Sequence, residues 1–299
     1  MSPGEISEII KSEILAAGFD RCGITEATEL SREKGLFMKW LDRGSHADMD
    51  FLKRNFEKRT DPGILFQGAK SVAVAVINYY TGRQDESPGM PVVSRYVTRV
   101  DYHTVVRERL HQALAASRKK IPGLEGRVCV DSAPVMEKAL AVRAGLGNQG
   151  RNSLLIVQGG GSFYFIGVII INLETEYDSP DLTDPCGTCR KCIESCPTGA
   201  ISEEGFLDAG RCISYLTVEH RGEIPGQFRG KLRNRIFGCD ICQEVCPHNC
   251  DASLTDIDEF ARDKRLDTMT LKEWAYLTPE GFKTIFAGTT VERRGYEAF

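Results

Sequence analysis

The sequence has no segment that would direct the chain to a membrane or to an export route. Its first residues, MSPGEISEIIKSEILAAGF, lack the basic start, the apolar centre and the cleavage site of a secretory signal. The longest apolar run covers residues 163–173, whereas a membrane-spanning helix needs roughly 20 apolar residues. We therefore expect a cytoplasmic protein that makes no contact with a membrane.

An excess of one charge, low-complexity tracts and long regular repeats are also missing. The 299 residues include 38 Lys and Arg against 42 Asp and Glu, which gives a net charge of −4, and 41% of the residues are hydrophobic. No heptad and no Gly-X-Y period runs through the chain. This composition excludes a disordered tail protein, a coiled coil and a collagen-like protein, and it favours one or two globular domains with a sizeable core.

Cysteine is the residue type whose distribution is informative. Eight of the 11 cysteines lie between Cys186 and Cys246. A disulfide framework does not suit a chain of this size without a secretory signal, so metal ligation is the better interpretation. Cys22 and Cys129 lie far from this segment, and we expect them to be buried free thiols. Cys250 follows the segment closely and could be an adventitious ligand.

The spacing of the eight cysteines is typical of two [4Fe-4S] clusters. The first four follow the run C-x2-C-x2-C-x3-C-P of bacterial two-cluster ferredoxins, in which the fourth cysteine ligates the other cluster. The last three repeat the end of that run, and an isolated cysteine between the two sets supplies the missing ligand. The predicted ligands are Cys186, Cys189, Cys192 and Cys246 for one cluster, and Cys196, Cys212, Cys239 and Cys242 for the other. This count leaves no place for Cys250.

Zinc is the alternative metal, because tetrahedral zinc sites also use paired C-x2-C units. Zinc has no use for the additional cysteine at the same spacing, nor for the repeated C-x3-C-P ending, so the pattern favours the clusters. Iron-sulfur clusters of this kind carry single electrons and do little substrate chemistry by themselves. The rest of the chain must therefore hold the site that uses the electrons.

Composition and periodicity divide the chain into three predicted parts. Helices are expected over residues 1 to about 60, 101–120 and from Pro134 to Gly145 or Gly147, and strands over residues 71–80, 127–130, 153–157 and 163–173. The predicted parts are an α/β (α+β) catalytic domain, a two-cluster ferredoxin-like module and a helical tail with an amphipathic stretch over 269–286, at residues 1–180, 181–250 and 251–299.

Asp131 lies at the junction between a predicted strand and a predicted helix. A side chain at such a junction is more often a helix cap than a catalytic acid, and the residues alone leave both roles open. The G-x-G-x-x-G sequence at 145–150 follows a helix and not a strand, so it is a weak dinucleotide fingerprint. The sequence also contains no P-loop.

Further motifs are spread over most of the chain: EKRTDP at 57–62, GAKSV at 68–72, DYH at 101–103, VDSAPV at 130–135, RAGLG at 143–147, LDAGRCISYLT at 207–217 and RIFGCDICQ at 235–243. In this order they resemble the epoxyqueuosine reductase family, the cobalamin-dependent iron-sulfur enzymes of queuosine synthesis. The resemblance implies a base-off cobalamin between the first domain and the ferredoxin-like module, reduced through the two clusters. It also implies a short form, without the C-terminal helical repeats of many relatives.

The substrate implied by the resemblance is tRNA that contains epoxyqueuosine at the wobble position, which the enzyme reduces to queuosine. Asp131 matches the family's proton donor, and burial against the corrin ring is expected to raise its pKa. The other implied cobalamin contacts are Arg59, Arg151, Asn152, Ser153, Ser214, Gly238 and Asp240. The alternatives are an ion pair with Asp61 for Arg59 and a local backbone hydrogen bond for Ser214.

A basic stretch between the cluster ligands is the predicted contact for tRNA. Residues 211–235 contain six Arg and Lys against two Glu, although the whole chain is acidic. The candidates are Arg221, Arg229, Lys231 and Arg233. A solvated basic loop is the alternative. The other expected partner is an external electron donor of the ferredoxin or flavodoxin type, and the chain is expected to be a monomer.

Two other functions share parts of this plan. A reductive dehalogenase combines cobalamin with two clusters, but such enzymes usually carry an export signal and a larger catalytic domain, and the sequence shows neither. A noncatalytic electron carrier of the ferredoxin type would not need the 180 residues that precede the cysteines.

Overall fold

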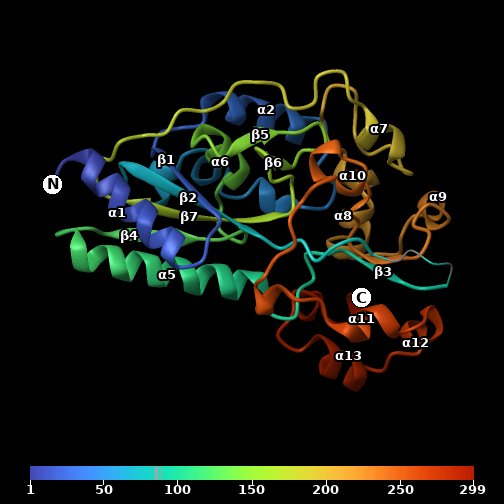
Figure 1. Cartoon of the computed structure of the whole chain (residues 1–299). Helices are drawn as coiled ribbons and strands as arrows, with labels where there is room; N and C mark the ends of the chain where they lie inside the picture. Colours follow the sequence, from blue (N-terminus) through green and yellow to red (C-terminus); the bar gives the residue numbers. More distant parts are fainter. Residues whose placement is uncertain (85–86, 88) are drawn as a thin grey trace.

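A four-stranded antiparallel sheet forms the centre of the N-terminal half in the computed structural model, which describes residues 1–84, 87 and 89–299 (Figure 1). In spatial order the strands are β1 (Arg21–Glu26), β2 (Ser71–Asn78), β7 (Tyr164–Ile171) and β4 (Gly126–Cys129). Every residue of β2 is buried, as expected for an apolar, β-branched run with neighbours on both sides and helices on both faces. The predicted strand over 71–80 is thus confirmed as the inner strand that orders the sheet.

Helices cover both faces of this sheet. On one face, α1 (Pro3–Ala16) and α5 (Tyr102–Lys120) lie side by side and bury Ile10 and Leu110 against the strands. On the other face, α6 (Glu137–Arg143) buries Leu140. The helix expected over 101–120 is confirmed. The two layers leave one end of the sheet free to meet the cysteine-rich segment.

The cysteine-rich segment forms a compact module of short elements: α7 (Lys191–Ser195), η2 (Ala209–Arg211), α8 (Ile213–Val218), α9 (Gly226–Arg229), β8 (Arg235–Phe237), α10 (Ile241–Glu244) and η3 (Pro247–Asn249). Strand β8 pairs in parallel with β3 (Val92–Val93), which comes from the first half of the chain. The module and the sheet domain are therefore joined by backbone hydrogen bonds as well as by the chain connection.

The C-terminal segment packs on this pairing and is no loose tail (Figure 1). Its elements are η4 (Asp258–Phe260), α11 (Lys264–Thr268), α12 (Leu271–Ala275), α13 (Pro279–Phe286), η5 (Glu292–Arg294) and η6 (Tyr296–Ala298). Trp274 and Phe286 are buried against Val93 and Phe237. The amphipathic stretch expected over 269–286 is divided into two helices, because Thr278 caps a new helix that begins with a proline.

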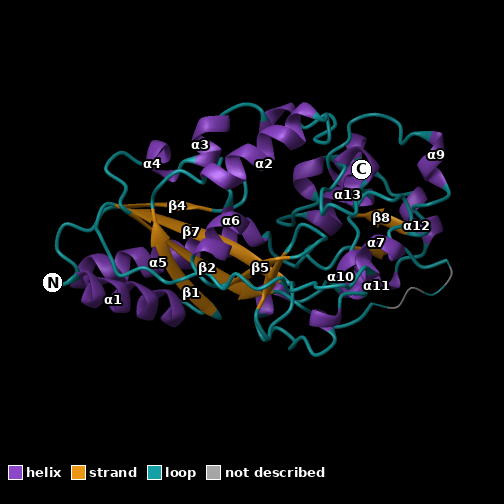
Figure 2. Cartoon of the chain, turned by 90° about the horizontal axis from the view of Figure 1, so that it is seen from above, coloured by secondary structure: helices purple, strands orange, loops and turns teal. Residues whose placement is uncertain are grey.

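A third group of elements packs around the sheet, and its helices lie above the strands in the view of Figure 2. It contains α2 (Ser31–Asp42), η1 (Asp50–Leu52), α3 (Phe56–Thr60), α4 (Pro62–Leu65) and a small sheet of β5 (Gly147–Gln149) and β6 (Leu155–Val157). None of the side chains of α2 is fully buried. The Trp40 indole N–H donates to the Leu207 carbonyl at 2.6 Å, so this segment reaches across to the cluster module.

Two expectations about local structure are wrong. Residues 1 to about 60 are not all helical, because Arg21–Glu26 forms the edge strand β1, whose short polar sequence gains its conformation by pairing with β2. The helix expected from Pro134 begins only at Glu137, after a turn in which the Glu137 carboxylate accepts the Asp131 backbone N–H at 2.5 Å. Gly147 does not end a helix but begins β5.

The boundaries at residues 180 and 250 stay predictions, and contacts cross both of them. The Arg151 guanidinium donates to the Gly187 carbonyl at 2.9 Å across the first boundary, and the Asn78 amide donates to the Ser253 carbonyl at 2.8 Å across the second. Among the described residues, no helix has the length and apolar character needed to cross a membrane. The parts of the chain therefore form a shared framework around the site between them.

Candidate functional site: a cluster module facing a polar cleft

The fold brings the eight predicted cluster ligands together in two groups. Burial, and then the neighbouring thiols of Cys186 and Cys246, raise the pKa of Cys192. The Cys246 thiol in turn faces Cys186 and Cys189. Burial and crowding disfavour the ionisation of these thiols in the protein by itself. An iron-sulfur cluster would reverse this effect, because the positive charge of its iron ions stabilises thiolates. This first group is the predicted set that contains the distant Cys246.

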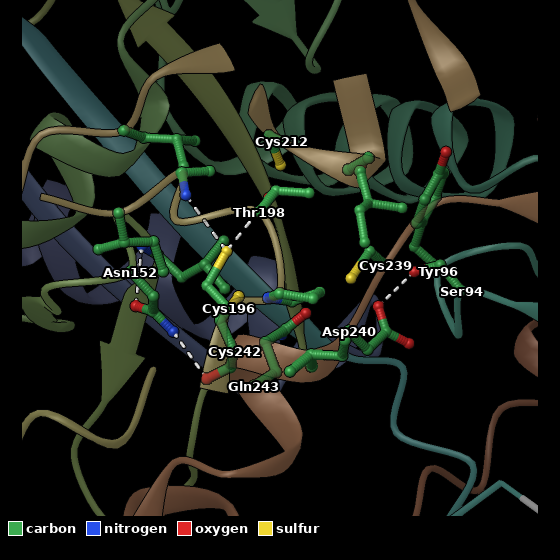
Figure 3. A pocket seen from close by; sticks show the side chains of 18 of the residues that line it. Ser94, Tyr96, Asn152, Cys196, Thr198, Cys212, Cys239, Asp240, Cys242 and Gln243 are labelled. Carbon is green, nitrogen blue, oxygen red and sulfur yellow. Dashed lines mark hydrogen bonds between the residues drawn. The ribbon is translucent and has the colours of Figure 1, made fainter. Parts of the chain in front are cut away.

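The second group surrounds a pocket of about 330 Å³ (Figure 3). Its lining includes Cys196, Cys212, Cys239 and Cys242. Burial, followed by the Cys239 and Cys212 thiols, raises the pKa of Cys242 well above its ordinary value, and Cys196 faces Cys212. Within the described part of the chain, no three His, Cys, Asp or Glu side chains converge closely enough to hold a single metal ion.

Hydrogen bonds to sulfur support both groups. The Arg151 backbone N–H donates to the Cys186 sulfur at 3.4 Å, and the Ala200 N–H donates to Cys196 at 3.3 Å. Burial raises the pKa of Cys196, but the Thr198 hydroxyl and nearby backbone N–H groups outweigh it and lower the pKa overall. Such bonds stabilise a thiolate and adjust the reduction potential of a cluster.

The pocket beside the second group also contains three of the predicted cobalamin contacts: Asn152, Ser214 and Asp240. The Asn152 amide donates to the Cys242 carbonyl at 3.4 Å. The Asp240 carboxylate is already occupied, because it accepts from the Ser94 hydroxyl, from the Arg95 backbone N–H at 2.8 Å and from the Arg95 guanidinium at 3.1 Å. Its first role in the protein is therefore to fix a buried arginine.

Gly238 lies beside this pocket and is not among its lining residues. Its φ is 71°, and a Cβ at this position would lie 2.4 Å from the Ser94 Cβ. Glycine is needed there for the left-handed turn that places the two following cysteine ligands. Its assignment as a cobalamin contact stays a prediction, whereas its conformational role is visible.

A second, larger cavity of about 1090 Å³ opens between the sheet domain, α2 and the cluster module. Arg59, Asp131, Arg151 and Ser153 line it, and Leu207 lines both cavities. The segment 151–153 thus forms a partition, with Asn152 on the side of the second cysteine group and its two neighbours on the side of the cleft. Seven of the predicted cobalamin-site residues therefore line two neighbouring cavities, whereas Gly238 lines neither.

Asp131 follows β4 and projects into this cleft with 57% of its side-chain surface exposed. Its φ is 43°, a left-handed conformation that is uncommon outside glycine. Its Oδ2 lies 2.9 Å from Nε2 of His103. The helix-cap alternative for Asp131 is wrong, because Met136 is the residue before α6 and no side chain caps that helix.

The rise in the pKa of Asp131 that is expected from a corrin ring stays a prediction, and in the protein by itself the pKa shifts in the other direction. Partial burial raises this pKa, but the hydrogen bond from His103 and the charge of that ring outweigh burial, so the pKa is lowered. Burial lowers the pKa of His103, yet its hydrogen bonds to Asp101 and Asp131 raise it above the ordinary value of 6.5. The pair therefore holds its proton on the imidazole.

Arg59 lies where its positive charge faces Glu137 and Asp131 across the cleft. Its Nε is buried and has no hydrogen-bond partner among the described residues. The alternative ion pair with Asp61 is not found there, since the Asp61 carboxylate accepts the Gly63 backbone N–H at 2.8 Å. Burial, and next the charge of Asp131, raise the pKa of Glu137 well above its ordinary value. A buried guanidinium nitrogen without a partner is suited to a polar ligand.

The predicted tRNA contacts are exposed but do not line either cavity. Arg229 pairs with Glu223 at 2.9 Å, and Arg221 donates to the Arg294 carbonyl at 3.2 Å. Helix α9, which carries Arg229, lies at the end of the module that points away from the sheet (Figure 1). The stretch is close to the clusters in sequence, but it lies outside the cleft.

Sequence reasoning missed three residues that surround the Asp131 side chain or its hydrogen-bond partner. His103 belongs to the DYH motif, which was visible but carried no assigned role, and Asp101 precedes it. Arg293, from η5 at the end of the chain, places Nη1 2.8 Å from Nδ1 of His103. No sequence signal joins residues this far apart.

Comparison with known proteins agrees with this geometry. The family described as "Epoxyqueuosine reductase QueG, DUF1730" matches residues 59–132, and the "4Fe-4S double cluster binding domain" matches residues 185–249. An epoxyqueuosine reductase of Cyclobacterium marinum is 41% identical over 294 residues, which cover 98% of this chain and 94% of the relative.

Solved structures of similar fold include an epoxyqueuosine reductase with an epoxyqueuosine-modified tRNA-Tyr stem loop. That structure is 30% identical with a TM-score of 0.89, and the match covers 97% of this chain and 78% of the other. An epoxyqueuosine reductase from Bacillus subtilis, with its catalytic aspartate loop swung out of the active site, is 29% identical with a TM-score of 0.88 and the same coverage. A reductive dehalogenase, 18% identical with a TM-score of 0.53 over 84% of this chain and 33% of its own, shares the fold.

Proposed function

The chain belongs to the epoxyqueuosine reductase family, and from this premise we propose that it holds cobalamin in the cleft between sheet and cluster module and uses Asp131 as its proton donor. The enzyme reduces epoxyqueuosine to queuosine in tRNA and carries two iron-sulfur clusters. The observation that supports the proposed site most directly is the position of Asp131, exposed in a large cleft beside the cysteine groups.

The residues of the cleft fit a large polar cofactor. Its volume of about 1090 Å³ lies just above the roughly 300–1,000 Å³ of ordinary ligand sites. The buried Nε of Arg59 lacks a partner among the described residues, and Arg151 and Ser153 offer further polar atoms. These three would hold cobalamin from the cleft side, and Asn152, Ser214 and the Gly238–Asp240 turn from the cluster side. Bound there and reduced through the clusters, cobalamin supplies a strongly reducing, nucleophilic cobalt.

Asp131 supplies the proton that epoxide opening requires. When a C–O bond of the epoxide breaks, its electron pair stays on oxygen, and protonation by a positioned acid stabilises the developing alkoxide. The B. subtilis relative is described as having a catalytic aspartate loop, and Asp131 lies on the loop between β4 and α6. A bound corrin and substrate would exclude water from the 57% of the side chain that is now exposed, which favours the protonated carboxyl.

The remaining partners follow from this chemistry. Each turnover consumes two electrons, so an external one-electron donor of the ferredoxin or flavodoxin type must reload the clusters. We place the protein in the cytoplasm because its substrate is tRNA, and we propose that it acts as a monomer. The exposed Arg221, Arg229, Lys231 and Arg233 contact tRNA outside the cleft.

Anaerobic cobalamin titration of the cluster-loaded protein tests the binding site. We expect the absorption spectrum of the base-off form in the wild type. Arg59→Gln should weaken binding by about tenfold or more, because a hydrogen bond to a charged group contributes about 1.5–3 kcal/mol. Arg54→Gln, an exposed arginine nearby, is the matched control. If Arg59→Gln binds cobalamin with wild-type affinity, Arg59 is not part of the binding site. If the wild type binds no cobalamin at all, the alternative of a noncatalytic electron carrier is favoured.

Turnover of an epoxyqueuosine-containing stem loop tests the acid. We expect Asp131→Asn to bind cobalamin normally and to convert the stem loop at least about 100-fold more slowly, as for loss of a general acid. Equal rates in the variant and the wild type would show that Asp131 is not the proton donor.

A further inference from the structure

A short chain of hydrogen bonds connects three titratable residues at the edge of the cleft. Nδ1 of His103 lies 2.6 Å from Oδ1 of Asp101, and Nε2 lies 2.9 Å from Oδ2 of Asp131. Only 9% of the His103 side-chain surface is exposed. Asp131 is thus the exposed end of a chain whose inner members are shielded from solvent.

The position of His103 is fixed by its own helix. Asp101 is the residue before α5, and its carboxylate also accepts the His103 backbone N–H at 2.9 Å. The Tyr102 ring stacks on the imidazole with centroids 4.0 Å apart. The ring is therefore held in place by a helix terminus and by a stacked neighbour.

The charges around the ring favour an imidazolium. A neutral imidazole has one acceptor nitrogen, which would place a lone pair against one of the two carboxylates, whereas the charged form donates to both. The opposing group is Arg293 of η5, whose Nη1 lies 2.8 and 2.9 Å from the two ring nitrogens. Glu137 of α6 reaches the group only through Asp131, whose backbone N–H it accepts. Two carboxylates in direct contact outweigh the single arginine.

We propose that His103 is a positioning residue that stores the proton delivered by Asp131 and reloads Asp131 during each turnover, with Asp101 holding the ring in register. The proposal rests on the proposed function, because Asp131 must be the acid for His103 to serve it. It also explains how a carboxylate that is ionised in the protein alone can act as a proton donor.

The proton transfer balances within the established reaction. The N–H bond at Nε2 of His103 breaks and an O–H bond forms on the Asp131 carboxylate, which leaves a neutral imidazole and a carboxylic acid. The acid then protonates the epoxide oxygen as a C–O bond breaks. Loss of the oxygen as water consumes two protons and two electrons and leaves the alkene. The electrons arrive through the clusters, and His103 regains its proton from solvent through Asp131.

Imidazole NMR of the protein without cobalamin gives a readout that is independent of activity. The chain has five histidines, and His103→Gln identifies the resonance of interest. We expect the pKa of His103 to lie above 6.5 in the wild type and to fall in Asp131→Asn and in Asp101→Asn. A value at or below 6.5 that neither substitution changes would overturn the proposal.

Single-turnover rates across pH complete the test. In the wild type the rate should decline as pH rises through the pKa of His103, because the stored proton is lost. In Asp101→Asn the decline should move to lower pH, and in His103→Gln it should disappear while the rate falls by about 100-fold near pH 6. His111→Gln, on the exposed side of the same helix, is the control.

The two hypotheses fail in different ways. If Asp131→Asn retains the wild-type rate, the proposed acid is wrong. If Asp131→Asn is slow while His103→Gln and Asp101→Asn keep the wild-type rate and pH profile, the proton-storing role of His103 is wrong and the acid stands. Cobalamin titration of each variant shows whether the cleft is intact.

Discussion

Removing the charge of Asp240 tests whether this residue first serves the fold or the cofactor. Asp240 and Arg95 are 6% and 2% exposed, and their buried ion pair spans 3.1 Å beneath the cluster pocket. In Asp240→Asn the single amide oxygen can replace either Oδ1, which accepts from Ser94, or Oδ2, which accepts from the Arg95 backbone and guanidinium, but not both. The guanidinium also loses one of its two carboxylates. Glu244 remains at 2.7 Å and is 26% exposed.

The expected cost follows from this geometry. Removing one partner of a buried ion pair typically destabilises a protein by about 3–5 kcal/mol. Because Glu244 still neutralises Arg95, we expect the lower end, about 3 kcal/mol. For a chain of this size each kcal/mol lowers the melting temperature by about 2–4 °C, so the shift should be about 6–12 °C.

Anaerobic thermal unfolding, followed by circular dichroism and by loss of cluster absorption at one fixed scan rate, measures this shift. Iron content should be equal in all samples. Glu244→Gln should cost less, and Arg95→Met combined with Asp240→Asn should recover much of the loss, since neither residue is then a buried, unpaired charge. An unchanged melting temperature in Asp240→Asn, or full additivity in the double variant, would refute the reasoning. Weaker cobalamin binding without a loss of stability would favour a direct contact.

Three further predictions concern other parts of the molecule. Replacing Arg229, Lys231 and Arg233 together by Gln should weaken binding of the tRNA stem loop, as measured by fluorescence anisotropy. The slope of log affinity against log salt concentration should become shallower by up to about 3. An unchanged slope would indicate that these residues form a solvated loop that does not contact tRNA. The difference in melting temperature between wild type and His103→Gln should be largest below pH 6.5 and should shrink as pH rises through the raised pKa of His103. The reason is that a histidine with a raised pKa stabilises the folded protein only while it is protonated. A difference that grows toward pH 8 would contradict this prediction. Gly238→Ala should destabilise the protein by about 1–3 kcal/mol without removing any hydrogen-bonding side chain. The reason is that residue 238 has a positive φ and that an added Cβ would contact Ser94. Equal melting curves for the variant and the wild type would show that the turn can adapt.

The cluster chemistry could be predicted from the sequence because it depends on spacing along the chain. The C-x2-C-x2-C-x3-C-P run fixes which cysteines can face one cluster, and the count of eight then includes the isolated Cys212. The structure places Cys192 near Cys246 and Cys196 near Cys212, and the allocation of the eight cysteines to two clusters stays a prediction. The long periodic elements, β2 and α5, were likewise predicted, since their burial is determined by the apolar pattern.

The protonation state of Asp131 could not be predicted, because it depends on groups that meet only in the folded chain. The sequence showed an aspartate between a strand and a helix, and the expectation of a raised pKa considered the cofactor alone. His103 comes from the start of another helix, and Arg293 approaches from the C-terminal segment that seemed to be a tail. Electrostatic interactions of this kind depend on distance in space, and sequence separation gives no measure of it.

The sequence by itself indicated the cluster chemistry and the family, because these depend on residue types at short spacing, and through the family resemblance it pointed to Asp131 as the candidate acid. Only the tertiary structure decided what surrounds that residue. Its side chain lies against His103, which Arg293 approaches from the C-terminal segment, and it projects into a cleft that three segments of the chain share. The pKa of a side chain is set by its neighbours in space, so the direction in which the proton moves is decided by the fold.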